Sequence, residues 1–167
     1  MEPVFENRYI RDKETAKEIS AFLYLKRPSG IVVGILCALC FAVHLTFLIL
    51  GYEYSVLGFI LLPTYLAYKY YCYFVSKNSF IKRDAETFKG DIVITTGVYE
   101  DHITVTAPNG SVVELEYDKI KKISLTKNYI LIMSKARLIY ILKKDGFTKG
   151  SLSEFTAFIK SKGIKIK

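Results

Sequence analysis

The chain has 167 residues, of which 51% are hydrophobic and 14% aromatic, and it carries a formal net charge of +8. Residues 76–167 hold 17 Lys and Arg against 10 Asp and Glu, so most of the positive charge lies there. The sequence contains no phosphate-binding glycine loop and no nucleophile elbow. Its C-x-x-C pair, Cys37 and Cys40, lacks the second ligand pair of a structural zinc site. We therefore expect no metal, no cofactor and no enzymatic activity.

Residues 1–29 are expected to form an N-terminal cytosolic segment with a short strand followed by an amphipathic helix. The strand is predicted at residues 4–10. Asp12 is a suitable N-cap, and Ala16, Ile19, Phe22 and Leu23 then recur at helical spacing. The helix can dock on the C-terminal module or lie along a membrane surface. Docking is favoured, because its polar face carries both signs of charge rather than lysines alone.

Residues 30–75 contain two apolar runs, 30–50 and 55–75, each long enough to span a bilayer as a helix. Only four residues, 51–54, separate them, so the two predicted spans form a transmembrane hairpin. Positive charges flank its open end, whereas Glu53 occupies the link. The flanking cations are Lys26, Arg27, Lys77, Lys82 and Arg83. The positive-inside rule then predicts a multi-pass protein of the plasma membrane with both termini in the cytoplasm.

Two features of these spans point to helix packing and to anchoring at the membrane interface. Small residues recur every four positions in the first span: Gly30, Gly34, Ala38 and Ala42. Such a stripe allows another helix to approach closely. That helix is either the second span or a span of a second copy of the chain in a homodimer. Aromatic residues and one lysine crowd the end of the second span and are expected to anchor it at the headgroups; they are Tyr68, Lys69, Tyr70, Tyr71 and Tyr73. His44 is expected to bond across the hairpin to Thr64 or Tyr65.

The polar residues 76–89 are expected to be a short connector, and residues 90–167 a cytosolic α+β domain. Short alternating runs separated by turn residues predict about six or seven antiparallel strands, with Pro108-Asn109-Gly110 as a hairpin turn. Ser151 and Glu154 then fit a capping box at the start of a C-terminal amphipathic helix. This fold class is a sheet or barrel sealed by one helix.

Several stretches of this module resemble those of a known family. They are residues 97–103 (GVYEDHI), 117–123 (YDKIKKI) and 129–132 (YILI), together with Phe147, Gly150, Glu154 and Phe155. The order of strands and helix resembles pleckstrin-homology-like (PH-like) domains, and with two spans before it the chain is similar to the YcxB-like family of bacterial membrane proteins. The resemblance implies a membrane-anchored protein whose role is uncharacterised, and it implies no catalytic residue.

The remaining charged residues favour a binding module over an enzyme. Glu100, Asp101 and His102 are consecutive, and alternate residues of a strand point to opposite faces, so we expect a solvated edge and no active site there. Lysines that could contact anionic lipid headgroups are Lys119, Lys121, Lys122, Lys143, Lys144 and Lys149. Few aromatic residues interleave with them, which disfavours nucleic acid. The expected function is recognition of an unknown protein or of a lipid surface, and the alternative is a homo-oligomeric membrane assembly.

Overall fold

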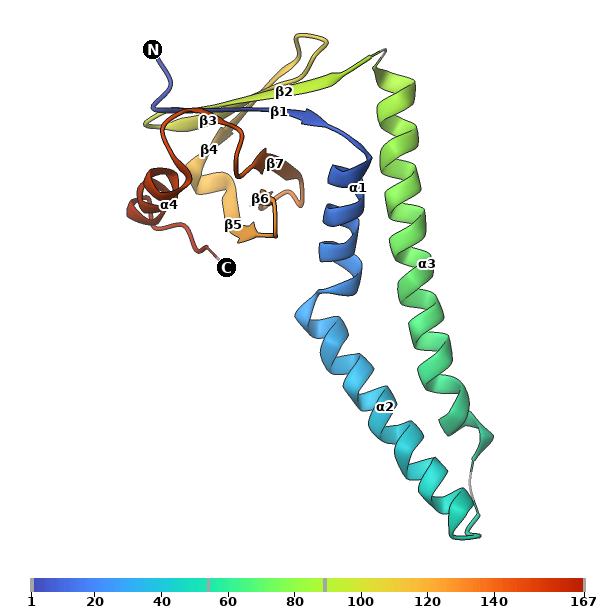
Figure 1. Ribbon diagram of the computed structural model, residues 1–167. Coiled ribbons are helices and arrows are strands. Elements are labelled where there is room, and N and C mark those ends of the chain that lie inside the picture. The colour runs from blue at the N-terminus through green and yellow to red at the C-terminus, as the bar shows by residue number, and fades with distance from the viewer. Residues whose placement is uncertain (1, 54, 89, 167) are drawn as a thin grey trace. The chain divides into compact units, whose positions relative to one another are not determined.

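The computed structural model describes residues 2–53, 55–88 and 90–166 (Figure 1). The chain divides into two compact units. The first, here called the β-domain, combines residues 1–12 with residues 84–167. The second, here called the helical segment, comprises residues 13–83. Tyr54 in the predicted link and Lys89 at the end of the predicted connector lie outside the described residues.

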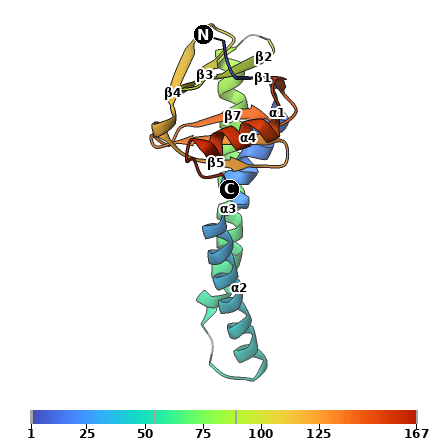
Figure 2. The same ribbon diagram turned by 90° about the vertical axis from the view of Figure 1, so that its left-hand side faces the viewer.

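The β-domain consists of two antiparallel sheets and a C-terminal helix, so the predicted combination of antiparallel strands with a terminal helix is confirmed (Figure 2). The larger sheet has the order β4-β3-β2-β1-β8 and the smaller one β5-β6-β7. The elements are β1 (Phe5–Arg11), β2 (Ile92–Val98), β3 (His102–Thr106), β4 (Val112–Glu116), β5 (Ile120–Leu125), β6 (Tyr129–Ser134), β7 (Ile139–Lys143), β8 (Phe147–Lys149) and α4 (Leu152–Ser161). A short 3-10 turn, Tyr117–Lys119, precedes β5.

Residues 90–166 contain seven strands, β2 to β8, in agreement with the predicted six or seven, and the N-terminal strand joins the larger sheet as an eighth. β1 lies between β2 and β8, and its pairing with β2 runs from Phe5 opposite Val98 to Arg11 opposite Ile92. Glu6 lies opposite Lys149 on the other side of β1. The two ends of the chain therefore build one sheet, although the whole helical segment separates them in sequence.

One hydrophobic core joins both sheets and α4. Phe5 from β1 and Phe155 from α4 meet edge to face with ring centroids 6.0 Å apart. In Figure 2 the helix α4 lies in front of strands β5 and β7, and its Phe155 and Ile159 are fully buried. The predicted capping box starts this helix: the Glu154 amide donates to the Ser151 hydroxyl oxygen at 3.3 Å, and that hydroxyl donates to the Glu154 carboxylate at 2.7 Å.

A buried asparagine connects the two sheets. The Asn7 side chain on β1 is 1% exposed. Its side-chain Nδ2 atom donates to the backbone carbonyl of Lys143 at 2.7 Å. The backbone N–H of Lys143 donates back to the side-chain Oδ1 atom of Asn7 at 3.1 Å. The side chain thus satisfies both backbone groups of a residue at the end of β7, which lies in the other sheet.

The helical segment contains three consecutive helices and all but the last four residues of one long returning helix. They are α1 (Lys13–Ser20), a π-helical turn (Ala21–Leu25), α2 (Pro28–Ile49) and α3 (Val56–Thr87). The predicted connector is not a separate element, because α3 continues through it without interruption to Thr87. Within the described residues, one helix is long and apolar enough to cross a membrane, Pro28–Ile49. The tyrosines and Lys69 of α3 lower its mean hydropathy.

We predict that residues 84–167 alone do not fold stably, because they lack β1. Removing the strand exposes the partners of Phe5 and Tyr9, at about 1.5–3 kcal/mol for each buried side chain, and leaves the β2 and β8 edges unpaired. A domain is stabilised by only about 5–15 kcal/mol. Replacing residues 13–90 by Asn-Gly reconnects Asp12 to Asp91 through a two-residue hairpin turn and should restore cooperative thermal unfolding, measured by circular dichroism. Equal melting midpoints for the two chains would contradict this role of β1.

We predict that Asn7→Ala destabilises the β-domain by about 2–4 kcal/mol, because two backbone groups of the half-buried Lys143 lose their partners. Arg8→Ala, on the exposed side of the same strand, is the matched control and should change the free energy of unfolding by less than about 0.5 kcal/mol. Urea unfolding of the relinked domain measures both. Similar losses for the two variants would show that strand propensity, rather than the Asn7 hydrogen bonds, determines the effect.

Candidate functional site: the groove beside Lys69

The helices α2 and α3 pack along two half-buried faces with alternating spacings of three and four residues. The face of α2 consists of Gly30, Gly34, Cys37, Phe41 and His44, and that of α3 consists of Gly58, Leu62, Tyr65, Lys69, Cys72 and Ser76. Phe41 meets Phe59 edge to face with centroids 5.4 Å apart. Gly58 is buried against the imidazole of His44, which a Cβ at this position would strike. Steps of three and four residues place successive side chains on one face of a helix.

The predicted stripe of small residues divides between this contact face and the exposed surface. A Cβ on Gly30 would lie 2.5 Å from the Lys69 Nζ atom, and one on Gly34 would lie 3.3 Å from the Tyr65 ring. Ala38 and Ala42 are exposed. Each four-residue step turns about 40° beyond a full helical turn, so the stripe drifts away from α3 as it continues. At the first two positions the close partner is therefore the second helix of the same chain.

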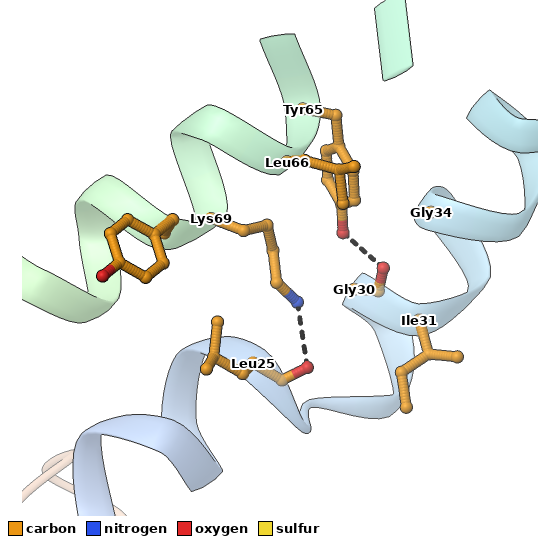
Figure 3. A pocket seen from close by; sticks show the side chains of 8 residues that line it. Leu25, Gly30, Ile31, Gly34, Tyr65, Leu66 and Lys69 are labelled. Carbon is orange, nitrogen blue, oxygen red and sulfur yellow. Dashed lines mark hydrogen bonds between the residues drawn. The ribbon is translucent and has the colours of Figure 1, made fainter. Parts of the chain in front are cut away.

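Two polar side chains of α3 donate hydrogen bonds to backbone carbonyls on either side of the start of α2. The Tyr65 hydroxyl donates a hydrogen bond to the backbone carbonyl of Gly30, and the Lys69 ammonium donates one to the carbonyl of Leu25 at 3.3 Å (Figure 3). Leu25 ends the π-helical turn, and α2 begins anew at Pro28. Carbonyls at such a helix end lack intrahelical donors. The lysine therefore stabilises the break between the two helices.

A groove opens beside this pair of hydrogen bonds. It has a volume of about 470 Å³, and its lining residues are Leu25, Gly30, Ile31, Gly34, Tyr65, Leu66, Lys69 and Tyr70 (Figure 3). A second groove of about 310 Å³ contains Gly30, Tyr65 and Lys69 in its lining as well, together with Leu23, Tyr24, Arg27, Ser29, Val33, Tyr68 and Cys72. Both linings are apolar with one or two cations, and none of these residues is acidic.

The predicted interface anchors take different positions. Tyr68, Tyr70 and Tyr71 are exposed, at 63%, 64% and 66%. Tyr73 and Lys69 are half-buried, and Lys69 turns toward Leu25. The predicted bond from His44 to Thr64 or Tyr65 is wrong: the His44 Nδ1 atom bonds the Cys40 carbonyl of its own helix at 2.8 Å. The Tyr65 hydroxyl is used by Gly30 instead.

The predicted headgroup-binding lysines of the β-domain do not form one patch. Ile120 pairs with Ser134 at one end of the smaller sheet, and Lys143 pairs with Tyr129 at the other. Lys119, Lys121 and Lys122 therefore lie at the opposite end from Lys143 and Lys144, while Lys149 lies in the larger sheet. Four of the six have protein partners: Lys119 with Glu116 at 3.0 Å, Lys143 with Asp145 at 3.4 Å, Lys149 with Glu2 at 3.3 Å and Lys144 with the Thr126 carbonyl at 2.6 Å.

The consecutive residues Glu100, Asp101 and His102 separate at the turn between β2 and β3. Glu100 pairs with Lys162 at 3.3 Å. His102 lies between two carboxylates, with Nδ1 2.6 Å from Asp101 and Nε2 3.4 Å from Glu114. The hydrogen bond to His102 lowers the pKa of Asp101. Both ring nitrogens of His102 therefore face carboxylates. The Tyr99 ring stacks on the imidazole ring with centroids 4.6 Å apart. These contacts stabilise the turn between β2 and β3.

We predict that Gly30→Leu weakens the contact between α2 and α3 by about 1–3 kcal/mol, because the added side chain must displace the Lys69 amine and the Tyr65 hydroxyl. Ala38→Leu, on the exposed side of the same helix, should change it by less than about 0.5 kcal/mol. The measurement is unfolding of the full chain by titration with a denaturing detergent, followed by circular dichroism. A greater loss for Ala38→Leu would indicate that the exposed alanines form the critical interface.

The comparisons with known proteins concern the β-domain alone. The family model described as YcxB-like protein matches residues 98–159, from the end of β2 into α4. A search of curated proteins and a search of solved structures found no match. The matched stretch includes neither β1 nor the helical segment. The β-domain thus contains a YcxB-like region at residues 98–159, and the resemblance predicted from the sequence is confirmed.

Proposed function

We propose that this chain is a membrane-anchored recognition protein. A two-span hairpin, residues 30–50 and 55–75, would hold a PH-like domain at the cytoplasmic face of a bacterial plasma membrane. The observation that carries the proposal is the pairing of β1 with β2, because it constrains the path of everything between them.

The pairing requires the helical segment to leave the β-domain and return to the same place. Arg11 and Ile92 are direct partners at the ends of β1 and β2. The Arg11 guanidinium also lies 3.5 Å from the carboxylate of Asp84, near the end of α3. Both strands must lie on one side of a membrane, so the chain between them crosses an even number of times. If α2 crosses, a second segment must cross back, and α3 is the helix available for it.

The surface of α2 supports a lipid environment. This helix has 22 residues, and none of them is buried. Large apolar side chains point outward around it, for example Val32 at 56% and Leu36 at 60% exposure. Water contact with so much apolar surface is unfavourable, whereas hydrocarbon accommodates it. The tyrosines of α3 suit the membrane interface, where an aromatic ring contacts hydrocarbon and its hydroxyl contacts water.

The distribution of charge supports a cytoplasmic β-domain. Lys26 and Arg27 precede α2, and Lys77, Lys82 and Arg83 lie toward the end of α3, while the link carries Glu53. Cations concentrate on the cytoplasmic side of membrane proteins. Because both sets of cations lie at the ends that return to the β-domain, the rule assigns that domain to the cytoplasm.

The surface of the β-domain favours a protein over a lipid as the recognised partner. The six predicted headgroup-binding lysines are dispersed, and four of them have partners within the chain. The edge strand β4 instead exposes Val112 at 60% and Val113 at 43%. A groove of about 150 Å³ beside it has a mainly apolar lining, which includes Val105, Val113 and Ile139. An extended peptide can add to such an edge through backbone hydrogen bonds and place side chains in the groove.

We predict that cysteine labelling will find the link and the β-domain on opposite sides of the membrane. The background carries Cys37→Ala, Cys40→Ala and Cys72→Ala, and the reporters are Glu53→Cys in the link and Asn109→Cys in the β3–β4 turn, both exposed positions. A membrane-impermeant maleimide should label Glu53→Cys in intact cells, and Asn109→Cys only after lysis. Labelling of both from the same side would exclude the proposed hairpin.

A further inference from the structure

The groove beside Lys69 has the chemistry of a binding site for a charged lipid. An ammonium group has three N–H donors, and the bond to the Leu25 carbonyl at 3.3 Å uses one of them. The Tyr65 ring, with its centroid 5.8 Å away, lies on one side of the amine. Lys69 belongs to the linings of both grooves, and Arg27 belongs to one of them. Lys69 therefore faces space in the larger groove that no acidic side chain of its lining neutralises.

The rest of the larger groove is apolar. Ile31 and Leu66 form opposite walls, on α2 and α3, and are 51% and 56% exposed. Gly34, further along α2, also lines the groove and contributes no side chain to it (Figure 3). A ligand that matches this site has an anionic end for Lys69 and a hydrocarbon portion for Ile31 and Leu66.

The depth of the groove points to one class of ligand. On α2 the lining begins at Gly30 in the first turn of the helix, which follows the cations Lys26 and Arg27. If the hairpin spans the membrane as proposed above, this turn lies at the boundary between headgroups and hydrocarbon. A cation that is partly withdrawn from water there is costly unless an anion accompanies it. Phospholipid phosphates lie at that depth.

We propose that this groove binds an anionic phospholipid, with the headgroup at Lys69 and one acyl chain against Ile31, Gly34 and Leu66. This inference rests on the proposed membrane insertion. The lipid would join α2 to α3 at the break after Leu25. It would also give the chain a preference for membranes rich in anionic lipid that does not depend on the lysines of the β-domain.

The test uses the full chain in nanodiscs made from equal amounts of phosphatidylcholine and phosphatidylglycerol. The protein is then extracted in mild detergent, and the retained lipids are counted by mass spectrometry. We expect wild type to retain phosphatidylglycerol preferentially, and Lys69→Gln to reduce the preference roughly tenfold, as for one charge-assisted hydrogen bond. Lys69→Arg should keep it.

The matched control is Lys77→Gln, which removes the same charge from the same helix. The Lys77 amine lies 5.2 Å from the centroid of the Phe74 ring, and the residue belongs to neither lining. The Lys77→Gln variant should retain phosphatidylglycerol with the same preference as wild type. Equal losses in Lys69→Gln and Lys77→Gln, or no preference in wild type, would overturn the site. Displacement of the lipid by millimolar inorganic phosphate would assign Lys69 to a soluble anion and would also overturn it.

The same preparation separates this inference from the proposed function. Incorporation into nanodiscs reports on the membrane anchor, and the composition of the retained lipid reports on the groove. A chain that incorporates but retains both lipids equally would contradict the lipid site alone. A chain that does not incorporate would contradict the anchor, and the lipid site with it.

Discussion

The pairing of the N-terminal strand with strands that follow the helical segment is the constraint on which the rest of this structure depends. β1 is an inner strand of its sheet, with β2 on one side and β8 on the other. Its inward side chains contribute to the core through Phe5 and connect the two sheets through Asn7. The β-domain therefore forms only after the helical segment has been made and has returned, and the helical segment is an insertion within a domain.

The helical segment is joined to the β-domain at the ends of two neighbouring strands. Arg11 ends β1, Ile92 begins β2, and the two residues are paired. The ion pair between Arg11 and Asp84 adds a contact at the same place, with both side chains mostly buried at 23% and 17% exposure. Partly buried pairs are screened less by salt than surface pairs are. If the helical segment crosses a membrane, this pairing requires that it cross an even number of times.

Most local elements could be predicted from the sequence, because their signals are local. Alternation and turn residues identified the strands from Ile92 to Leu142, and Ser151 with Glu154 identified the start of α4. The partner of β1 could not be predicted in this way. A strand pattern at residues 4–10 says that one face is buried, but it carries no information on which distant strand covers that face. The same limit concealed that residues 84–167 are an incomplete sheet.

The candidate site shows where pattern reasoning falls short on helix surfaces. A repeat of four small residues suggested one packing face, but the helix turns past its partner, and only Gly30 and Gly34 meet α3. The half-buried face follows alternating steps of three and four residues and includes Cys37, Phe41 and His44. Lys69 was predicted to be an interface anchor, and its hydrogen bond to the Leu25 carbonyl joins residues 44 positions apart, which a local sequence pattern cannot indicate.

A disulfide between β1 and β2 in native membranes tests the central claim most directly. Arg8 and Thr95 are direct partners across these strands. The Arg8 backbone N–H bonds Gly146 in the opposite direction, so the pair is of the closely spaced, non-hydrogen-bonded kind that suits a disulfide. In a chain without its native cysteines, Arg8→Cys with Thr95→Cys should form an intramolecular bond on mild oxidation. Failure to crosslink, or crosslinks only between chains, would contradict the account.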